Sequence, residues 1–210
     1  MTDAAPLTFS SLDDSDELAR AELYGLLARL WLAPPDAELL QQFGVAVTQA
    51  PEAGGLLEGP WMELVGVLRA TTPEAAAAEH AALFLAIGKP EVFTYASYYL
   101  SGFLHEKPLA TLREDLAALG LTRDTQSTET EDHIAYVLEV MRYLIAGDDV
   151  ATCNLEQQRR FFRTHVQPWV GQLCSAVRAH PRARTWAAVA IFTQAFMDVE
   201  TQGFDMLEVS

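Results

Sequence analysis

Cysteine, basic residues and long apolar runs are all scarce in this chain of 210 residues. Its two cysteines, Cys153 and Cys174, form no C-x-x-C pair, which is typical of a protein in a reducing cytoplasm. Lysine and arginine number 14 against 29 acidic residues, and a net charge of −15 argues against a nucleic-acid binder, which needs a basic surface. No run approaches the roughly 20 apolar residues that span a bilayer, and the acidic N-terminus does not resemble a signal peptide. We therefore expect a cytoplasmic protein.

Motifs of catalysis and of cofactor binding are also missing from the sequence. It has no G-x-x-x-x-G-K-[ST], no G-x-G-x-x-G, no G-x-S-x-G and no H-E-x-x-H. The Glu-x-x-His pairs of di-iron helical bundles do not occur either. We therefore predict no catalytic residues, no cofactor and no enzymatic activity.

Hydrophobic residues make up 50% of the chain, enough for a sizeable core. They recur at helical spacing, and no segment alternates like a strand. The sequence predicts an all-α bundle of about eight or nine helices, in two lobes joined by a hinge. The expected parts are a flexible tail at 1–13, an N-terminal helical lobe at 14–120, a hinge at 121–130 and a C-terminal helical lobe at 131–210.

The most informative stretch runs from Ser127 to Gly147. Thr128 and Glu131 fit a capping box, which predicts a helix beginning there, and Gly147 stands where a left-handed C-cap is expected. The helix has one apolar stripe, formed by Ile134, Val137, Leu138, Met141, Leu144 and Ile145. Its first turn would hold Glu129, Glu131, Asp132 and His133. Acids suit the positive end of a helix dipole, but an imidazole gains nothing there, so His133 suggests a further role.

Three interpretations of this acidic turn are open. Glu129, Asp132 and His133 form a conceivable facial triad for a metal in a helical enzyme, although the ligands of such sites usually come from separate elements. The carboxylates could instead hold guanidinium groups of a peptide by charge-assisted hydrogen bonds, which accounts for them better. The turn could also be only a cap in a generic helical interaction module.

A second unusual stretch is dense in aromatic residues. Phe93, Tyr95, Tyr98 and Tyr99 follow closely after the helix breakers Gly88 and Pro90. Tyrosine combines apolar area with a hydroxyl, so this cluster suits either a buried corner or the wall of a peptide-binding site. We favour the structural corner.

The segment E-T-E-D-H, followed by I-A-Y-V-L-E-V-M-R-Y-L, resembles the E-P-x-D-H hinge motif of the TorD/DmsD/NarJ family, the cytoplasmic chaperones of molybdenum-cofactor redox enzymes. Other segments agree in order. R-A-E-L-Y-G-L-L-A-R-L-W resembles the family's first helix, S-Y-Y-L-S-G its S-x-Y-L element, and R-R-F-F-R-T-H-V-Q-P-W with F-M-D-V-E its closing pattern. The likeness runs from about Arg20 to Glu200. Thr130 replaces the proline of the motif and so removes a fixed φ from the hinge.

The resemblance implies an all-helical chaperone that binds the twin-arginine leader or the apo form of a molybdopterin-dependent oxidoreductase, delays its export and aids cofactor insertion. It implies a monomer or a domain-swapped dimer, and clients such as a nitrate, dimethyl sulfoxide or trimethylamine N-oxide reductase or a formate dehydrogenase. By motif match, Glu129, Asp132 and His133 would bind the leader. The adjoining groove would be shaped by Leu83, Phe84, Pro90, Ser97 and Tyr99. Core packing explains Leu83 and Phe84 equally well.

Overall fold

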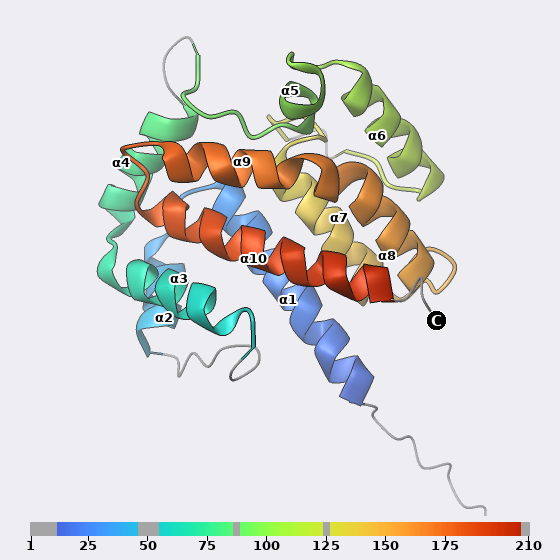
Figure 1. The fold of residues 1–210 in the computed structure, drawn as a ribbon, viewed down its shortest axis with the longest axis horizontal. Coiled ribbons are helices and arrows are strands. Elements are labelled where there is room, and N and C mark those ends of the chain that lie inside the picture. Colours follow the sequence, from blue (N-terminus) through green and yellow to red (C-terminus); the bar gives the residue numbers. More distant parts are fainter. Residues whose placement is uncertain (1–11, 46–54, 86–88, 124–126, 207–210) are drawn as a thin grey trace, which may run out of the picture.

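The computed structural model describes residues 12–45, 55–85, 89–123 and 127–206, and these residues are almost entirely helical (Figure 1). In order, the elements are α1 (Leu12–Leu32), α2 (Ala37–Val45), α3 (Glu58–Ala70), α4 (Pro73–Phe84), α5 (Ala96–Ser101), α6 (Lys107–Ala118), α7 (Ile134–Ala146), α8 (Leu155–Phe161), the π-helical turn η1 (Phe162–Val166), α9 (Gln167–Ala179) and α10 (Thr185–Met206). The all-α class is confirmed. The short helix α5 lies in the aromatic stretch, where no helix was predicted.

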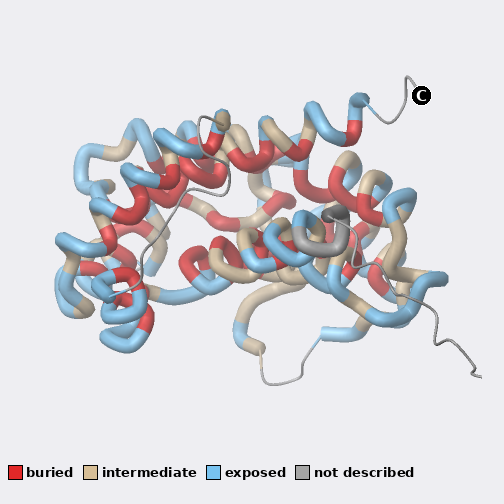
Figure 2. The backbone as a smooth tube through the Cα atoms, turned by 90° about the horizontal axis from the view of Figure 1, so that it is seen from below, coloured by how far each residue is buried: buried red, intermediate tan, exposed pale blue. Residues whose placement is uncertain are grey.

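The core forms where the apolar faces of the long helices meet. α1 packs along α7, and α10 packs on both α9 and α3. The buried residues of these helices face the interior, as Figure 2 shows. Both expected lobes contribute to this one core, because α1 and α3 lie in 14–120 while α7 and α10 lie in 131–210. The lobe and hinge boundaries stay a prediction. Most of the expected tail, residues 1–11, lies outside the described residues, and Leu12 and Asp13 belong to α1.

Several helix starts follow from local side-chain chemistry, as predicted. Asp36 accepts a hydrogen bond from the backbone N–H of Leu39 at 2.8 Å, before α2. Thr72 accepts one from Ala75 at 3.2 Å and so caps α4, with Pro73 in the first turn. Asn154 caps α8 in the same way. These short polar side chains occupy the donors that a helix N-terminus leaves free.

The predicted start of α7 is wrong, whereas its predicted end at Gly147 is confirmed in position but not in conformation. The helix begins at Ile134, with His133 as its N-cap, and not at the box of Thr128 and Glu131. The segment before it cannot be helical because its main chain pairs with the start of α5. Gly147 has φ −76° and ψ 153°, which is extended and not left-handed. Glycine is needed there for space, since a Cβ would lie 2.8 Å from the carbonyl oxygen of Tyr143.

The chain runs from α8 to α9 without leaving the helical path, through η1. Pro168 stands in the first turn of α9. A proline has no N–H, and its ring collides with the carbonyl four residues earlier, so a regular α-helix cannot pass through it. The wider π turn just before it accommodates this misfit. It also brings His165 to the face of α6, where its Nε2 lies 2.7 Å from Asp115 Oδ2.

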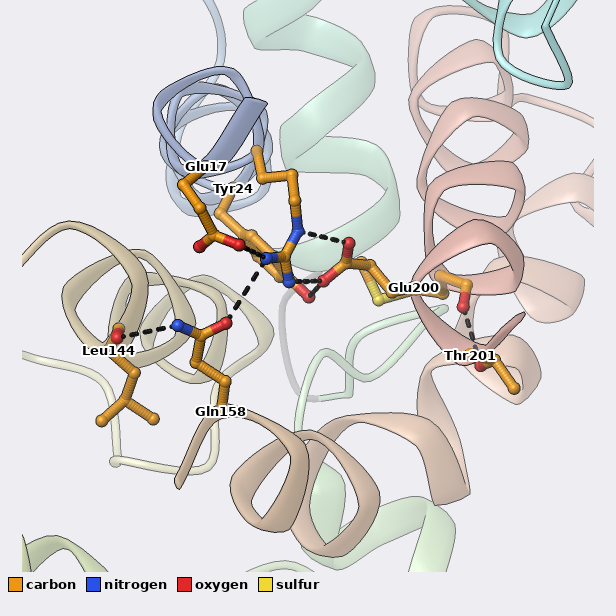
Figure 3. Close-up of polar contacts among 8 residues, drawn as sticks. Glu17, Tyr24, Leu144, Gln158, Glu200 and Thr201 are labelled. Atoms are coloured by element: carbon orange, nitrogen blue, oxygen red, sulfur yellow. Dashed lines mark hydrogen bonds and ion pairs between the residues drawn. The ribbon is translucent and has the colours of Figure 1, made fainter. Parts of the chain in front are cut away.

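A buried polar network joins α1 to the end of α10 and to α8 (Figure 3). Arg20 donates two hydrogen bonds to the carboxylate of Glu200, at 2.9 and 2.8 Å. The hydroxyl of Tyr24 donates a third, at 2.9 Å, to the same carboxylate. Gln158 of α8 accepts from Arg20 at 3.4 Å and donates to the carbonyl of Leu144. Residues far apart in the sequence are thereby fixed in one arrangement.

Candidate functional site

The acidic segment before α7 and the aromatic segment before α5 meet in the structure. Tyr95 and His133 form an isolated antiparallel bridge, the one β interaction among the described residues. Ala96 donates its N–H to the carbonyl of Asp132 at 3.0 Å, and Ile134 donates to the carbonyl of Thr94 at 2.8 Å. The two stretches that sequence analysis singled out therefore form one junction.

Asp132 is a structural anchor of this junction. Its side chain is 1% exposed. One carboxylate oxygen accepts the backbone N–H of Ser97 at 2.9 Å, in the first turn of α5, and the other accepts the hydroxyl of Thr130 at 2.6 Å. A buried carboxylate needs such donors to offset its lost hydration. Thr130, which replaces the motif's proline, supplies one of these two donors. Its hydrogen bond restrains the segment, as the fixed φ of a proline would.

His133 has a local reason for its place that the sequence did not reveal. Its ring Nδ1 accepts the backbone N–H of Ala135 at 3.2 Å, so the neutral imidazole itself caps α7. The ring packs edge-on against Tyr95, with centroids 5.2 Å apart. Burial lowers the pKa of His133 to about 4, against the opposing influence of Glu129 and Asp132. His133 is therefore neutral near pH 7.

Glu129 lies beside this cap and accepts a hydrogen bond from the hydroxyl of Tyr95. Burial and this contact with Glu129 raise the pKa of Tyr95. His80 of α4 is buried close enough for Glu129 to act on its charge, although burial dominates and lowers the pKa of His80. Among the described residues, no three His, Cys, Asp or Glu side chains converge in a way that could hold a metal ion.

Leu83, Phe84 and Pro90 come from the end of α4 and the segment after it. Leu83 is fully buried, and its carbonyl accepts the N–H of Val92 at 3.0 Å. Phe84 packs edge-on against Trp31 and Trp186 and against His80, with centroids 5.2 to 6.1 Å apart. Pro90 is half-buried. Leu83 and Phe84 thus pack into the core. Core packing was the alternative to groove lining that the sequence left open for these two residues.

Ser97 and Tyr99 lie on α5. Ser97 is buried at the junction, and its hydroxyl accepts the N–H of His105 at 3.2 Å. Tyr99 stacks on Trp169 of α9 with centroids 5.8 Å apart and donates its hydroxyl to the carbonyl of Phe93 at 2.8 Å. These contacts are those of a structural corner, the interpretation that the sequence favoured.

The structure adds a groove that the sequence did not reveal. It lies between the end of α6, residues 121–123 with Ser127 and Glu131, and the outer face of α7, and its volume is about 290 Å³. Its lining is mainly apolar and aromatic and includes Leu116, Leu121, Tyr136, Val140 and Tyr143. The last three recur at i, i+4 and i+7 on α7, a second apolar stripe beside the buried one. That spacing was the available sequence signal, hidden by the stronger stripe.

Two carboxylates, those of Glu131 and Glu139, and one guanidinium, that of Arg123, also line this groove. Glu131 accepts a hydrogen bond from Arg113 of α6 at 2.8 Å. Glu139 accepts one from Arg142, one turn further along α7, at 2.7 Å. The guanidinium of Arg113 lowers the pKa of Glu131, although desolvation opposes this shift. Both acids are therefore placed to hold guanidinium groups next to an apolar surface.

A second cavity, of about 330 Å³, lies where α5, α6 and η1 meet. Its lining includes Leu100, Lys107, Thr111 and His165. It is separate from the acidic segment, and none of the residues predicted for leader binding lines it. Of the helices in the described part of the chain, none combines the length and the apolar character that crossing a membrane requires.

An all-helical fold with an acidic junction and an adjoining apolar groove defines a TorD-like helical protein. A crystal structure from Archaeoglobus fulgidus, provisionally described as a redox enzyme maturation protein, has the same fold, with a TM-score of 0.53 over 94% of this chain and 99% of that one, at 19% identity. Among curated proteins, the chaperone protein TorD of Aliivibrio fischeri is 24% identical over 200 residues, which are 87% of this chain and 93% of that protein. TorD of Vibrio cholerae serotype O1 is 27% identical over 138 residues, 62% of this chain and 63% of that protein.

The family model for the nitrate reductase delta subunit matches residues 51–175, more than half of the chain. The chain belongs to the nitrate reductase delta subunit family. The TorD/DmsD/NarJ resemblance drawn from the sequence is thereby confirmed, and the matched region contains the junction, the groove and all the residues predicted for leader binding.

Proposed function

We propose that this protein is a maturation chaperone for a molybdopterin-dependent oxidoreductase, and that it binds the twin-arginine leader of that enzyme in the groove between α6 and α7. The observation that carries the proposal is the pairing, in one groove, of an apolar aromatic lining with two carboxylates. A leader of this kind joins arginines to an apolar run, so it complements both parts. The chaperone names of the TorD relatives support the role.

The residues named from the sequence take different parts in this proposal. Glu131, which belongs to the acidic turn, and Glu139, which the sequence did not single out, contact the arginines because they line the groove. Asp132, His133 and Ser97 are buried and already hydrogen-bonded within the chain, so they hold the junction in shape rather than contact the peptide. Glu129 is only partly buried and remains available at the edge of the junction.

Leu83, Phe84 and Tyr99 support this arrangement from the core, and Pro90 shapes the chain between α4 and α5. The protein carries out no turnover of its own in this proposal. It delays export by covering the leader, and it aids insertion of the molybdopterin cofactor by holding the apo-enzyme in a receptive state.

The test is titration calorimetry with the leader peptide of the oxidoreductase whose gene lies beside this one. We expect a Kd in the micromolar range or tighter, and weaker binding by Glu131→Gln and Glu139→Gln. Glu63→Gln is the matched control, because Glu63 is exposed on α3 and does not line the groove. Absence of binding to that leader, or equal weakening by all three substitutions, would refute the proposed site.

Cofactor insertion needs its own measurement. The client oxidoreductase is produced with and without this protein, and its molybdopterin content is determined after purification. We expect a lower content without the chaperone. An equal content in both preparations would leave leader binding as the whole function.

A further inference from the structure

The groove already holds guanidinium groups, and they belong to the chain itself. Arg113 donates to Glu131 and Arg142 donates to Glu139, at 2.8 and 2.7 Å. Each carboxylate that the proposed function assigns to a peptide arginine is thus occupied by an internal one. An incoming guanidinium has to share these oxygens or replace the group that holds them.

The two internal arginines differ in how firmly they are held. The side-chain stem of Arg142 lies against Gly25 of α1, so closely that a Cβ at Gly25 would be 2.8 Å from Arg142 Cδ. Packing therefore fixes Arg142 independently of its ion pair. Arg113 is half exposed, on the outer side of α6, and its one side-chain hydrogen bond within the described residues goes to Glu131. The two side chains are equally exposed, at 50% for Arg113 and 49% for Arg142, so what distinguishes Arg142 is the contact of its Cδ with Gly25.

Because the side chain of Glu131 is largely covered, we expect an incoming guanidinium to replace Arg113 rather than to share Glu131 with it. Its side chain is only 14% exposed, although it lies beside the open groove. A largely covered carboxylate offers little room for a second guanidinium in good hydrogen-bonding geometry, and leaving it without a partner is costly. A peptide that displaces Arg113 must therefore bring an equivalent group of its own.

We propose that Arg113 is an internal competitor for the peptide site, which occupies Glu131 in the empty groove and is exchanged for an arginine of the bound peptide. This inference rests on the proposed function. Exchange of one guanidinium for another returns only part of the electrostatic energy that capture of an unpaired carboxylate would give, so the apolar contacts set most of the affinity. A peptide with a neutral side chain in that position cannot replace Arg113, and the groove therefore selects for arginine.

The prediction is opposite in sign for the two partners of the pair. Removal of the competitor by Arg113→Gln tightens binding of an arginine-containing leader by about two- to fivefold, the usual range for an exposed ion pair. Glu131→Gln weakens binding of the same peptide. In the double variant Arg113→Gln/Glu131→Gln, the gain disappears, because no carboxylate remains for the peptide to take.

The experiment is titration calorimetry of these three variants and the unaltered protein, with the leader peptide and with a copy in which both arginines are glutamine. Arg182→Gln is the matched control, because it removes an exposed arginine that is ion-paired with Glu91, away from the groove, and changes the net charge by the same amount. Melting curves establish that every variant is folded.

We expect tighter binding by Arg113→Gln, no such gain by Arg182→Gln, and no gain for the glutamine peptide. Equal or weaker binding of the leader by Arg113→Gln would overturn the inference while the proposed function stands. An equal gain in affinity by Arg182→Gln would mean that net charge alone explains the tighter binding, and it would also overturn the inference. No binding by any variant would refute the proposed function itself.

Discussion

His133 is predicted to make the fold sensitive to acid in a defined range of pH. Its pKa is about 4 in the folded protein and 6.5 in its ordinary state. The unfolded chain therefore takes up a proton on this side chain before the folded protein does, and stability falls as the pH decreases from about 6.5 to about 4. Protonation also removes the Nδ1 acceptor that caps α7.

The magnitude follows from the two pKa values. A difference of one pKa unit corresponds to about 1.4 kcal/mol, so the stabilising effect of neutral His133 amounts to about 3 kcal/mol in full, and about 2 kcal/mol of it is lost at pH 5. Above pH 6.5 the effect is fully present. This shift includes the charges of Glu129, Asp132 and His80, and the rings of Tyr95 and Tyr136 also pack against the imidazole.

The assay compares the unaltered protein with His133→Asn by urea unfolding at pH 7.5, 6 and 5. Asparagine is a good N-cap and does not titrate. All other side chains are the same in both proteins, so the difference in unfolding free energy between the two proteins isolates His133. We expect the advantage of the unaltered protein to shrink by about 2 kcal/mol between pH 7.5 and pH 5. A difference that stays constant over this range would refute the reasoning.

Three further predictions concern stability. Glu79 of α4 accepts the N–H groups of Arg184, Thr185 and Trp186 and so caps α10. Glu79→Ala should therefore lower the free energy of unfolding by about 2 kcal/mol and the melting temperature by roughly 4–8 °C. A loss under 0.5 kcal/mol would contradict this. Arg20→Met or Glu200→Leu alone should cost about 3 kcal/mol in urea unfolding. The double substitution should cost less than the sum of the two, because it leaves no buried charge unpaired; Glu17, the other acidic partner of Arg20, is exposed. Additive losses would argue against the pair. Gly147→Ala should cost about 1–3 kcal/mol, because its Cβ would collide with Tyr143 and Cys153, and a neutral result in the same assay would show that the turn can open.

The fold class and the family could be predicted from the sequence because both depend on local patterns. The apolar spacing of α1, the caps at Asp36, Thr72 and Asn154, and the buried stripe of α7 all act within a few residues. An apolar stripe predicts which helix face is buried, and a capping side chain satisfies the free N–H groups of the first turn. Neither depends on where the helix lies in the fold. The order of the family motifs then placed the acidic segment in the correct region.

The details of the site could not be predicted because they depend on contacts between distant residues. The sequence placed Glu129, Asp132 and His133 on one helical turn, whereas Asp132 lies in a turn closed by the hydrogen bond from His133 N–H to Thr130, and His133 pairs with Tyr95. No local rule indicates that Glu79 caps a helix that begins more than a hundred residues later, or that Arg113 reaches Glu131. The groove exists only because the end of α6 comes to lie against the outer face of α7.

The bridge between Tyr95 and His133 has a consequence for the evolution and engineering of the chain. It ties together the entrances of α5 and α7, so everything between them, including α6, begins and ends at nearly the same point in space. The inner residues of this segment, Tyr99 of α5 and Leu112 and Leu116 of α6, pack on the core, so only its exposed positions can change without loss of stability. Under the proposed function, substitutions at exposed positions of α6 would alter recognition of the client while the bridge keeps both ends of the segment in place.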